Sequence, residues 1–340
     1  MKPLNVISTK NIKDYVRTVM NTIPLIFNQR QIQRTVIGGS EFVAPLEQCL
    51  PISIVIINRG ARQYRSQIFQ RLQNFNFRQI IFVEQAGNDY ELENLTKTYP
   101  FVKFLVPLEK VTVGDLVNMA VSEVDTEYAL VLWNDTSIKG DNLSRRFVEK
   151  VISEQILCQV PFLSTVSRQD LPVQMVPSMP GNIFTVNPCM TYKDKAPTLY
   201  PFDFIGLYNC EKFKQLGGFD YTIKNSYWQN MDFSFRAWLW GEEIRLASLF
   251  KVEYQEEVIP EDTTRDFSYL RFYLKNIAPI FKMDHADLPR KKMFKYISKA
   301  HFGLFDAIRD FNDARQWIEK NKYRFKNDSK IFIDTWGSLI

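Results

Sequence analysis

The sequence predicts an α/β protein in which a largely parallel sheet alternates with helices and a helical region follows. Short, almost continuously apolar segments, rich in β-branched residues, recur through the first half of the chain, as is typical of strands buried on both faces. Segments with helical spacing separate them, which favours a doubly wound sheet. After about residue 255 the chain changes character and predicts several helices.

The expected strands and helices follow one another from residue 52 onward. Strands are expected at residues 52–57, 80–83, 102–106, 128–133 and 202–208, and helices at residues 63–74, 113–124, 211–216, 231–240, 267–283, 291–305 and 305–321. Residues 158–198 contain six prolines, which predict short interrupted strands and loops. Gly217 and Gly241 are expected to end the helices that precede them.

The 340 residues divide into three expected parts, which are an N-terminal extension at 1–48, the α/β domain at 49–255 and a helical C-terminal region at 256–340. The 43 basic and 38 acidic residues give a net charge of +5, which argues against nucleic-acid binding through bulk charge. No apolar window is long enough to span a bilayer, and the N-terminus is unlike a secretory signal, so we expect a soluble cytoplasmic protein.

Polar side chains follow three of the predicted strands at the point where each strand ends. Asn58 and Arg59 follow the first strand, Glu84 follows the second, and Asn134 and Asp135 follow the strand at 128–133. In doubly wound sheets ligands bind at the carboxyl ends of the strands, so we expect these side chains to share one crevice. Taken singly, each residue is equally explained by the preference of polar residues for turns.

The segment around residues 228–241 combines charged and aromatic residues in a short predicted helix. Asp232 is expected in its first turn, and Arg236 follows at i+4, so the two side chains can pair. The simpler interpretation is a surface ion pair of little energetic weight. Further along, Pro289–Lys292 with Lys295 and Lys299 forms a basic patch, which is either a solvated face or a peripheral membrane contact or acceptor site.

Four stretches, taken in order, resemble glycosyltransferases of the GT-A fold, in particular the large family-2-like group. Residues 52–59 resemble the first nucleotide-contacting strand and turn, and residues 81–89 resemble the VDDGSxD strand end. Residues 114–120 resemble the helix that brings an asparagine, here Asn118, toward the nucleotide sugar. Residues 132–135 resemble the DxD strand end, and the resemblance continues to about residue 255.

The resemblance implies a GT-A type Rossmann-like fold and an enzyme that moves a sugar from a nucleotide-diphosphate-sugar donor to a glycan, lipid or protein acceptor. It also implies a divalent cation, Mn²⁺ or Mg²⁺, with Asp135 as its ligand, because charge accumulates on the leaving diphosphate. The donor-binding residues that it implies are Asn58, Arg59, Glu84, Asn118, Asn134, Asp135, Trp228 and Arg236.

The chain departs from the family pattern at three places. Trp133 stands where the DxD motif has its first aspartate, and Tyr254 or Glu253 stands where the family often has a metal-binding histidine. Gln229 and Asn230 stand where inverting members carry a Glu-Asp pair with the catalytic aspartate. An amide cannot accept a proton from the acceptor hydroxyl, so an inverting mechanism lacks its base here.

Two interpretations of these departures remain open. Residues 228–238 also resemble a run of polypeptide N-acetylgalactosaminyltransferases, which retain configuration, and this implies Asn230 and Asp232 as catalytic residues. Alternatively the site is degenerate, and the protein is a non-catalytic nucleotide-sugar-binding or scaffold protein on the same fold. A nucleotidyltransferase is a third class, but its glycine-rich GxGxR-like loop after the first strand is missing.

Overall fold

The computed structural model describes residues 27, 30–39, 49–60, 65–87, 91–139, 143–298 and 303–339, and they form an α/β fold as the sequence predicts. The main sheet has nine strands within this described part, in the order β1-β4-β3-β2-β5-β10-β7-β11-β6. Its strands are β1 (Arg34–Gly38), β2 (Leu50–Ile57), β3 (Phe77–Val83), β4 (Val102–Pro107), β5 (Tyr128–Trp133), β6 (Thr136–Ile138), β7 (Cys158–Ser164), β10 (Gly206–Asn209) and β11 (Ile244–Tyr254).

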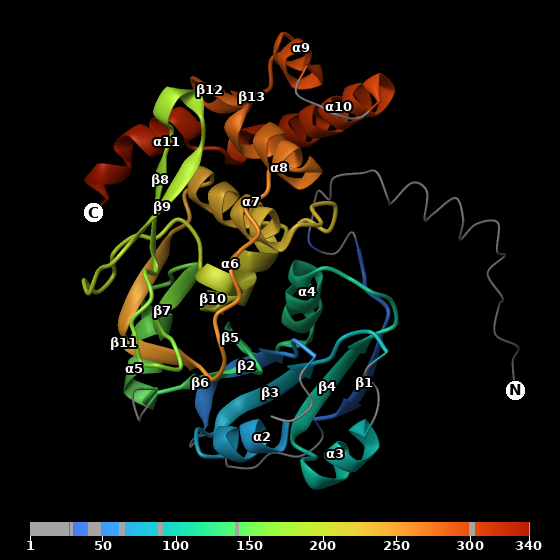
Figure 1. Ribbon diagram of the computed structural model, residues 1–340, viewed down its shortest axis with the longest axis vertical. Coiled ribbons are helices and arrows are strands. Elements are labelled where there is room, and N and C mark those ends of the chain that lie inside the picture. The colour runs from blue at the N-terminus through green and yellow to red at the C-terminus, as the bar shows by residue number, and fades with distance from the viewer. Residues whose placement is uncertain are drawn as a thin grey trace, which may run out of the picture.

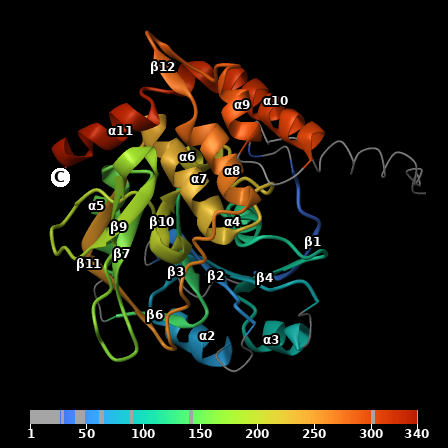
Figure 2. The same cartoon turned by 45° about the horizontal axis from the view of Figure 1, so that its top comes forward.

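The centre of this sheet is parallel and buried. Strand β2 pairs in parallel with β3 and β5, and β3 pairs in parallel with β4. Their side chains are apolar on both faces because helices cover both, which explains the unbroken runs of Ile, Val and Leu. Figures 1 and 2 show α2 (Arg65–Gln73) and α3 (Leu92–Thr98) on one face of β2 to β4, and α4 (Val113–Glu123) on the other.

The edge strand β1 extends the sheet beyond the expected domain. It pairs antiparallel with β4 and lies before residue 49, where the sequence analysis begins the α/β domain. Most of the expected N-terminal extension lies outside the described residues. The strand therefore ties part of that extension to the central sheet.

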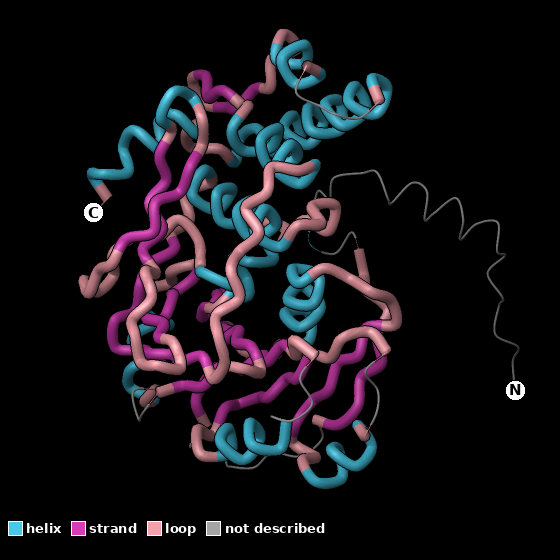
Figure 3. Tube along the Cα trace, in the orientation of Figure 1, coloured by secondary structure: helices cyan, strands magenta, loops and turns pink. Residues whose placement is uncertain are grey.

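The second half of the chain adds antiparallel strands and a helical layer, which Figure 3 shows above the sheet. A hairpin joins β8 (Gln174–Ser178) and β9 (Thr185–Cys189), and a second joins β12 (Ile280–Lys282) and β13 (His285–Asp287). Helix α5 (Arg145–Ser153) lies apart from this layer, near β6 and β11 (Figure 1). The helices of the second half are α6 (Cys210–Gln215), α7 (Ser226–Leu239), α8 (Phe267–Phe272), α9 (Lys292–Ile297), α10 (Leu304–Asn321) and α11 (Ser329–Thr335). No helix of the described residues is both long and apolar enough to cross a membrane.

Three helices differ clearly from their predicted limits. The helix expected at 291–305 is α9, which ends at Ile297. Helix α7 begins at Ser226, because the Asn225 side chain caps it by accepting from the Trp228 amide, so Asp232 lies in its middle and not in its first turn. The helix expected at 267–283 ends at Ile277 with a π-helical turn, and the β12–β13 hairpin follows. The spacing of the aromatic residues alone does not predict this π-helical turn or the hairpin after it.

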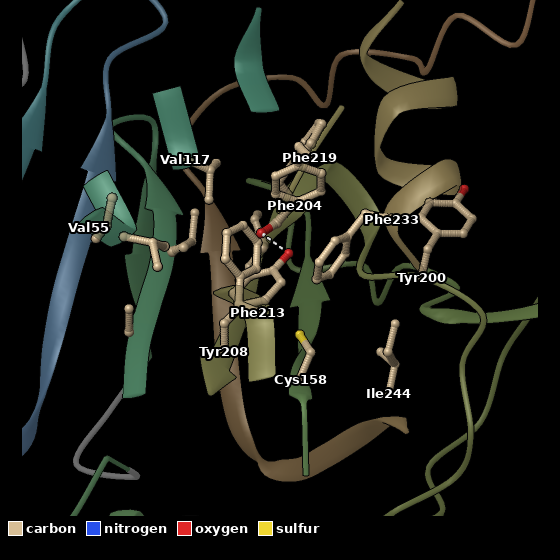
Figure 4. Close-up of a cluster of buried hydrophobic side chains, with 14 of the residues drawn as sticks. Val55, Val117, Cys158, Tyr200, Phe204, Tyr208, Phe213, Phe219, Phe233 and Ile244 are labelled. Atoms are coloured by element: carbon tan, nitrogen blue, oxygen red, sulfur yellow. Dashed lines mark hydrogen bonds between the residues drawn. The ribbon is translucent and has the colours of Figure 1, made fainter. Parts of the chain in front are cut away.

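An aromatic core joins the sheet to helix α7. The ring of Phe213 lies 4.9 Å from that of Phe233 and 5.4 Å from that of Phe219, centroid to centroid (Figure 4). Tyr208 reaches the same cluster from β10 and donates its hydroxyl to the Phe204 carbonyl at 3.0 Å. Because such rings bury large apolar areas, this cluster fixes α7 over the sheet.

Candidate functional site

The polar residues after β2, β3 and β5 meet at one edge of the sheet. We call Asn58, Arg59, Glu84, Asn134 and Asp135 the strand-end cluster. Asn58 lies at its centre, because its amide donates to Glu84 Oε2 at 2.6 Å and its carbonyl oxygen accepts from Asn134 Nδ2 at 2.9 Å. The cluster is therefore a single hydrogen-bonded unit, built from ends of parallel strands that lie far apart in the sequence.

Arg59 is the positively charged member of the strand-end cluster. Its backbone amide donates to Asn134 Oδ1 at 2.9 Å, which orients the residue after the strand ends. Its Nε lies 3.0 Å from Asp135 Oδ2, and its Nη2 pairs with Asp203. The guanidinium also lies over the Trp133 ring, with Cζ 3.8 Å from the centroid. One cation thus joins two carboxylates and an aromatic face.

The second carboxylate comes from a strained turn at residues 202–204. Asp203 and Phe204 both have left-handed backbone angles, with φ of 55° and 62°. Such angles cost energy for residues other than glycine and persist only where neighbours hold them. Here Trp133 Nε1 donates to the Asp203 carbonyl at 2.8 Å, and Asn230 Nδ2 donates to the Pro201 carbonyl at 2.7 Å. The turn is therefore held from two sides and aims Asp203 at Arg59.

Burial raises the pKa of both carboxyl groups that face Arg59. The pKa of Asp203 rises to about 6, because desolvation outweighs the attraction of Arg59 and the hydrogen bond from Tyr254. That bond runs from the Tyr254 hydroxyl to Asp203 Oδ2 at 2.9 Å. For Asp135, desolvation again raises the pKa, and Arg59 opposes the rise. Arg59 thus opposes the effect of burial on the pKa of both carboxyl groups and favours their ionised forms.

Asn118 is not part of the strand-end cluster. It lies on α4 and makes two bonds with Phe219, accepting from its amide at 2.9 Å and donating to its carbonyl at 2.8 Å. It also lines a cavity of about 300 Å³, together with Arg30, Asp115 and Tyr221. The asparagine therefore fixes the turn that leads to α7, and any contact with a sugar stays a prediction.

The charged residues of α7 form a separate, closed network. We call Asp220, Asp232, Arg236, Lys275 and Asn276 the α7 ion network. Asp232 Oδ2 pairs with Arg236 Nη1 and with Lys275 Nζ, the latter at 2.8 Å, and Asp232 Oδ1 accepts from Asn276 at 2.7 Å. Lys275 also pairs with Asp220 at 2.8 Å. These side chains are buried, so the pair expected at i and i+4 exists but is not a surface pair.

The remaining predicted site residues are also buried in helix α7. Asn230 has no exposed surface and is bonded to Pro201. Trp228 donates Nε1 to the Thr264 carbonyl at 2.7 Å and so anchors the segment at 255–266. That segment begins beside the strand-end cluster, since the Gln255 amide donates to the Asp135 carbonyl at 2.7 Å. Asn230 and Trp228 thus contact segments that lead to the strand-end cluster, whereas Asp232 belongs to the α7 ion network, and the catalytic and donor-binding roles of all three stay predictions.

The residues beside Asp135 do not fit a divalent cation well. Among the described residues, no group of three or more His, Cys, Asp or Glu side chains is arranged to hold a metal ion. Asp135 faces the Arg59 guanidinium, and Glu253 pairs with Lys139 at 2.5 Å. Hard cations such as Mg²⁺ and Mn²⁺ favour several oxygen ligands, which this arrangement does not offer.

Asp203 is the residue that sequence reasoning missed. It lies in an aromatic stretch that predicts a strand, and its partner Arg59 is 144 positions away in the chain. An acidic residue between Phe202 and Phe204 in an otherwise apolar run is the one local signal that marked it. Its role depends on the left-handed turn, which no spacing rule predicts.

No protein-family model matches the sequence, and no curated protein matches it. Among solved structures, the chain is similar to GalNAc-T7 with UDP, GalNAc and Mn²⁺, with a TM-score of 0.58 and 12% identity, covering 98% of this chain and 66% of that chain. It also matches S. aureus TarS 1–349 at TM-scores of 0.46 and, in complex with UDP-GlcNAc, 0.48, each with 13% identity over 79% of this chain and 71% and 72% of those chains. Together with the observed sheet, the likeness to GalNAc-T7 shows that this chain has the GT-A fold of glycosyltransferases, as its motifs predict.

Proposed function

We propose that the protein binds a nucleotide-diphosphate sugar at the strand-end cluster and transfers its sugar to a glycan, lipid or protein acceptor. The observation that carries this proposal is the joining of Asn58, Glu84 and Asn134 into one hydrogen-bonded unit at the carboxyl ends of parallel strands. Ligands of doubly wound sheets bind at this edge. In this proposal Asn58 and Glu84 hold the nucleoside. Arg59, which the sequence alone would assign to the nucleoside, lies with Asp135 toward the diphosphate.

Donor binding tests this proposal directly. Calorimetric titration with UDP-, GDP- and dTDP-sugars is expected to find one nucleotide that binds, and Glu84→Gln is expected to weaken it about tenfold by removing a buried acceptor. A matched control is Glu149→Gln, which changes an exposed acid on α5 that pairs with Arg145. Equal affinities for the wild-type protein and Glu84→Gln would contradict the placement of the nucleotide.

A binding protein without turnover is the second candidate, and specific observations favour it. Asp232 is fully buried with its oxygens already engaged, and Asn230 holds a backbone carbonyl. Neither side chain is exposed to solvent. Donor hydrolysis, measured as the release of free sugar, separates the two candidates. A protein that binds the donor but neither hydrolyses nor transfers it across a broad acceptor panel is a nucleotide-sugar-binding protein.

We further propose a peripheral membrane contact at helix α9, in a cytoplasmic protein. Arg290, Lys291 and Lys295 are exposed there, and Phe294 among them is 74% exposed, while Lys299 lies outside the described residues. Basic and aromatic side chains together favour an anionic lipid surface. Co-sedimentation with phosphatidylglycerol vesicles is expected, and it is expected to fall when Phe294 is replaced by Ser. No sedimentation at low salt would contradict the contact.

A further inference from the structure

The guanidinium of Arg59 lies between two carboxylates that come from different parts of the chain. Asp135 follows β5, and Asp203 lies in the strained turn after Pro201. Nε lies 3.0 Å from Asp135 Oδ2, and Nη2 pairs with Asp203 Oδ2. The side chain of Arg59 is 17% exposed, and those of the two aspartates are 7% and 16% exposed. A single positive charge therefore faces two acids in a partly enclosed site.

The residue that breaks the DxD-like pattern is the one that holds this guanidinium. Trp133 replaces the first carboxylate of that motif, and its ring lies 3.8 Å beneath Arg59 Cζ. Its indole Nε1 also donates to the Asp203 carbonyl and so places the second carboxylate. Arginine stacks on aromatic faces far better than a hydrated metal ion does. Trp133, in place of an aspartate, thus removes a metal ligand and supplies an aromatic surface on which an organic cation can pack.

A second departure from the family pattern also favours Arg59 over a metal ion. Tyr254 stands where the resemblance places a metal-binding histidine, and its hydroxyl donates to Asp203 at 2.9 Å. Burial and the neighbouring Asp203 raise the pKa of this hydroxyl, so it stays protonated and donates. A protonated phenol that donates to a carboxylate is not a metal ligand. Two of the three departures, Trp133 and Tyr254, therefore converge on a site for Arg59.

We propose that Arg59 is the resident cation of this site, in the place of a divalent metal ion, so that nucleotide binding needs no metal. For the nucleotide, this inference rests on the proposed function. Arginine carries five N–H donors in a planar fork that matches phosphate oxygens. Nε and Nη2 face the two carboxylates, whereas Nη1 has no partner among the described residues. This leaves donors of a partly exposed guanidinium for a diphosphate oxygen.

Binding of Mn²⁺ alone, without nucleotide, tests the cation position. Removing the guanidinium leaves Asp135 and Asp203 without a counter-charge, which favours an added cation. In a titration monitored by the electron paramagnetic resonance signal of free Mn²⁺, Arg59→Gln is expected to bind Mn²⁺ at least tenfold more tightly than the wild-type protein. The double variant Arg59→Gln, Asp135→Asn is expected to lose this gain. Arg145→Gln, an exposed arginine on α5, is the matched control and is expected to change nothing.

A wild-type protein that binds Mn²⁺ as tightly as Arg59→Gln, or an Arg59→Gln site that survives Asp135→Asn, would overturn the inference. Nucleotide binding supplies the second measurement. For each of UDP, GDP and dTDP, the affinity measured in EDTA is expected to lie within twofold of the affinity measured in Mn²⁺. A tenfold loss of affinity in EDTA would overturn the metal-free site. If no nucleotide binds in either condition, the proposed function fails, while the Mn²⁺ comparison still decides the role of Arg59.

Discussion

Two charged clusters in this molecule use the same pair of residue types, an arginine and an aspartate, but water reaches them differently. In the α7 ion network, the side chains of Arg236 and Asp232 are 3% and 0% exposed. In the strand-end cluster, the Arg59 side chain is 17% exposed and pairs with Asp135. The arginine of the first cluster is almost completely shielded from water, whereas that of the second keeps a partly exposed surface.

The partners of the two arginines explain this difference. Arg236 donates Nε to the Leu216 carbonyl at 3.1 Å and Nη2 to the Gly218 carbonyl at 2.5 Å, in addition to its pair with Asp232. Lys275 then joins Asp232 to the C-terminal region. Such saturation is typical of a group that holds elements together. Burial and saturation therefore separate a structural ion pair from a functional one, which residue type and spacing do not.

Replacement of Arg236 by Gln is expected to have the largest effect. The change leaves the buried Asp232 with less counter-charge and deprives two backbone carbonyls of their donors. Breaking a buried ion pair by removing one partner costs about 3–5 kcal/mol of unfolding free energy. Urea denaturation followed by circular dichroism measures this loss.

The matched control for this change is Arg309→Gln. Arg309 pairs with Asp306 on the exposed face of α10, where an ion pair contributes about 0–1 kcal/mol. Equal losses in the two variants would mean that the α7 ion network is no more important for stability than a surface pair. The comparison of the two clusters would then lose its basis.

The acid sensitivity of Asp220 is the next largest effect. Burial opposes ionisation of this carboxyl, but Lys275 and Arg271 outweigh it and lower its pKa from 3.8 to about 2. A lowered folded-state pKa stabilises the protein above the unfolded pKa, and this stability is lost as the pH falls from about 4 to about 2. The loss amounts to about 2 kcal/mol.

Denaturation curves between pH 5 and pH 2, for the wild-type protein and Asp220→Asn, measure this effect. The variant is less stable at pH 5, but its unfolding free energy is expected to fall less steeply toward pH 2. Parallel pH profiles would show that the lysine does not hold this carboxylate ionised in the folded state.

The central sheet and the meeting of its strand ends were predictable because they depend on local patterns. Runs such as Leu50–Ile57 predict buried strands, and polar residues after parallel strands meet at one edge. The state of Asp232 was not predictable in this way. Its pairing with Arg236 follows from helical spacing, whereas its burial depends on Lys275, which lies 43 positions further along.

The same reasoning explains why Arg59 was expected to hold a nucleoside and not to replace a metal ion. Its position after β2 follows from the strand pattern. Its partner Asp203 depends on a turn with two consecutive left-handed residues, and such a turn exists only because tertiary contacts hold it. Sequence periodicity carries no information about these contacts.

Replacement of Asn230 by Ala tests whether this residue supports the turn at residues 202–204 or takes part in sugar transfer. Its amide donates to the buried Pro201 carbonyl at 2.7 Å, and the loss of this bond leaves that carbonyl only the longer bond from the Phe204 amide, at 3.2 Å. The expected cost is about 1–2 kcal/mol of unfolding free energy. A variant as stable as the wild-type protein but inactive in sugar transfer would instead support the catalytic role.

Replacement of Arg59 by Gln is expected to have the smallest effect on stability, about 1 kcal/mol, because its ion pairs are partly exposed and screened by water. It is the same substitution as at Arg236, so urea denaturation of the two variants compares the clusters directly. Below about pH 6 the loss should shrink further, since Asp203 takes up a proton and no longer needs the guanidinium. A loss as large as that of Arg236→Gln would place Arg59 among the residues that hold the fold together, and a cation so tightly committed to its carboxylates is a poor donor for a diphosphate.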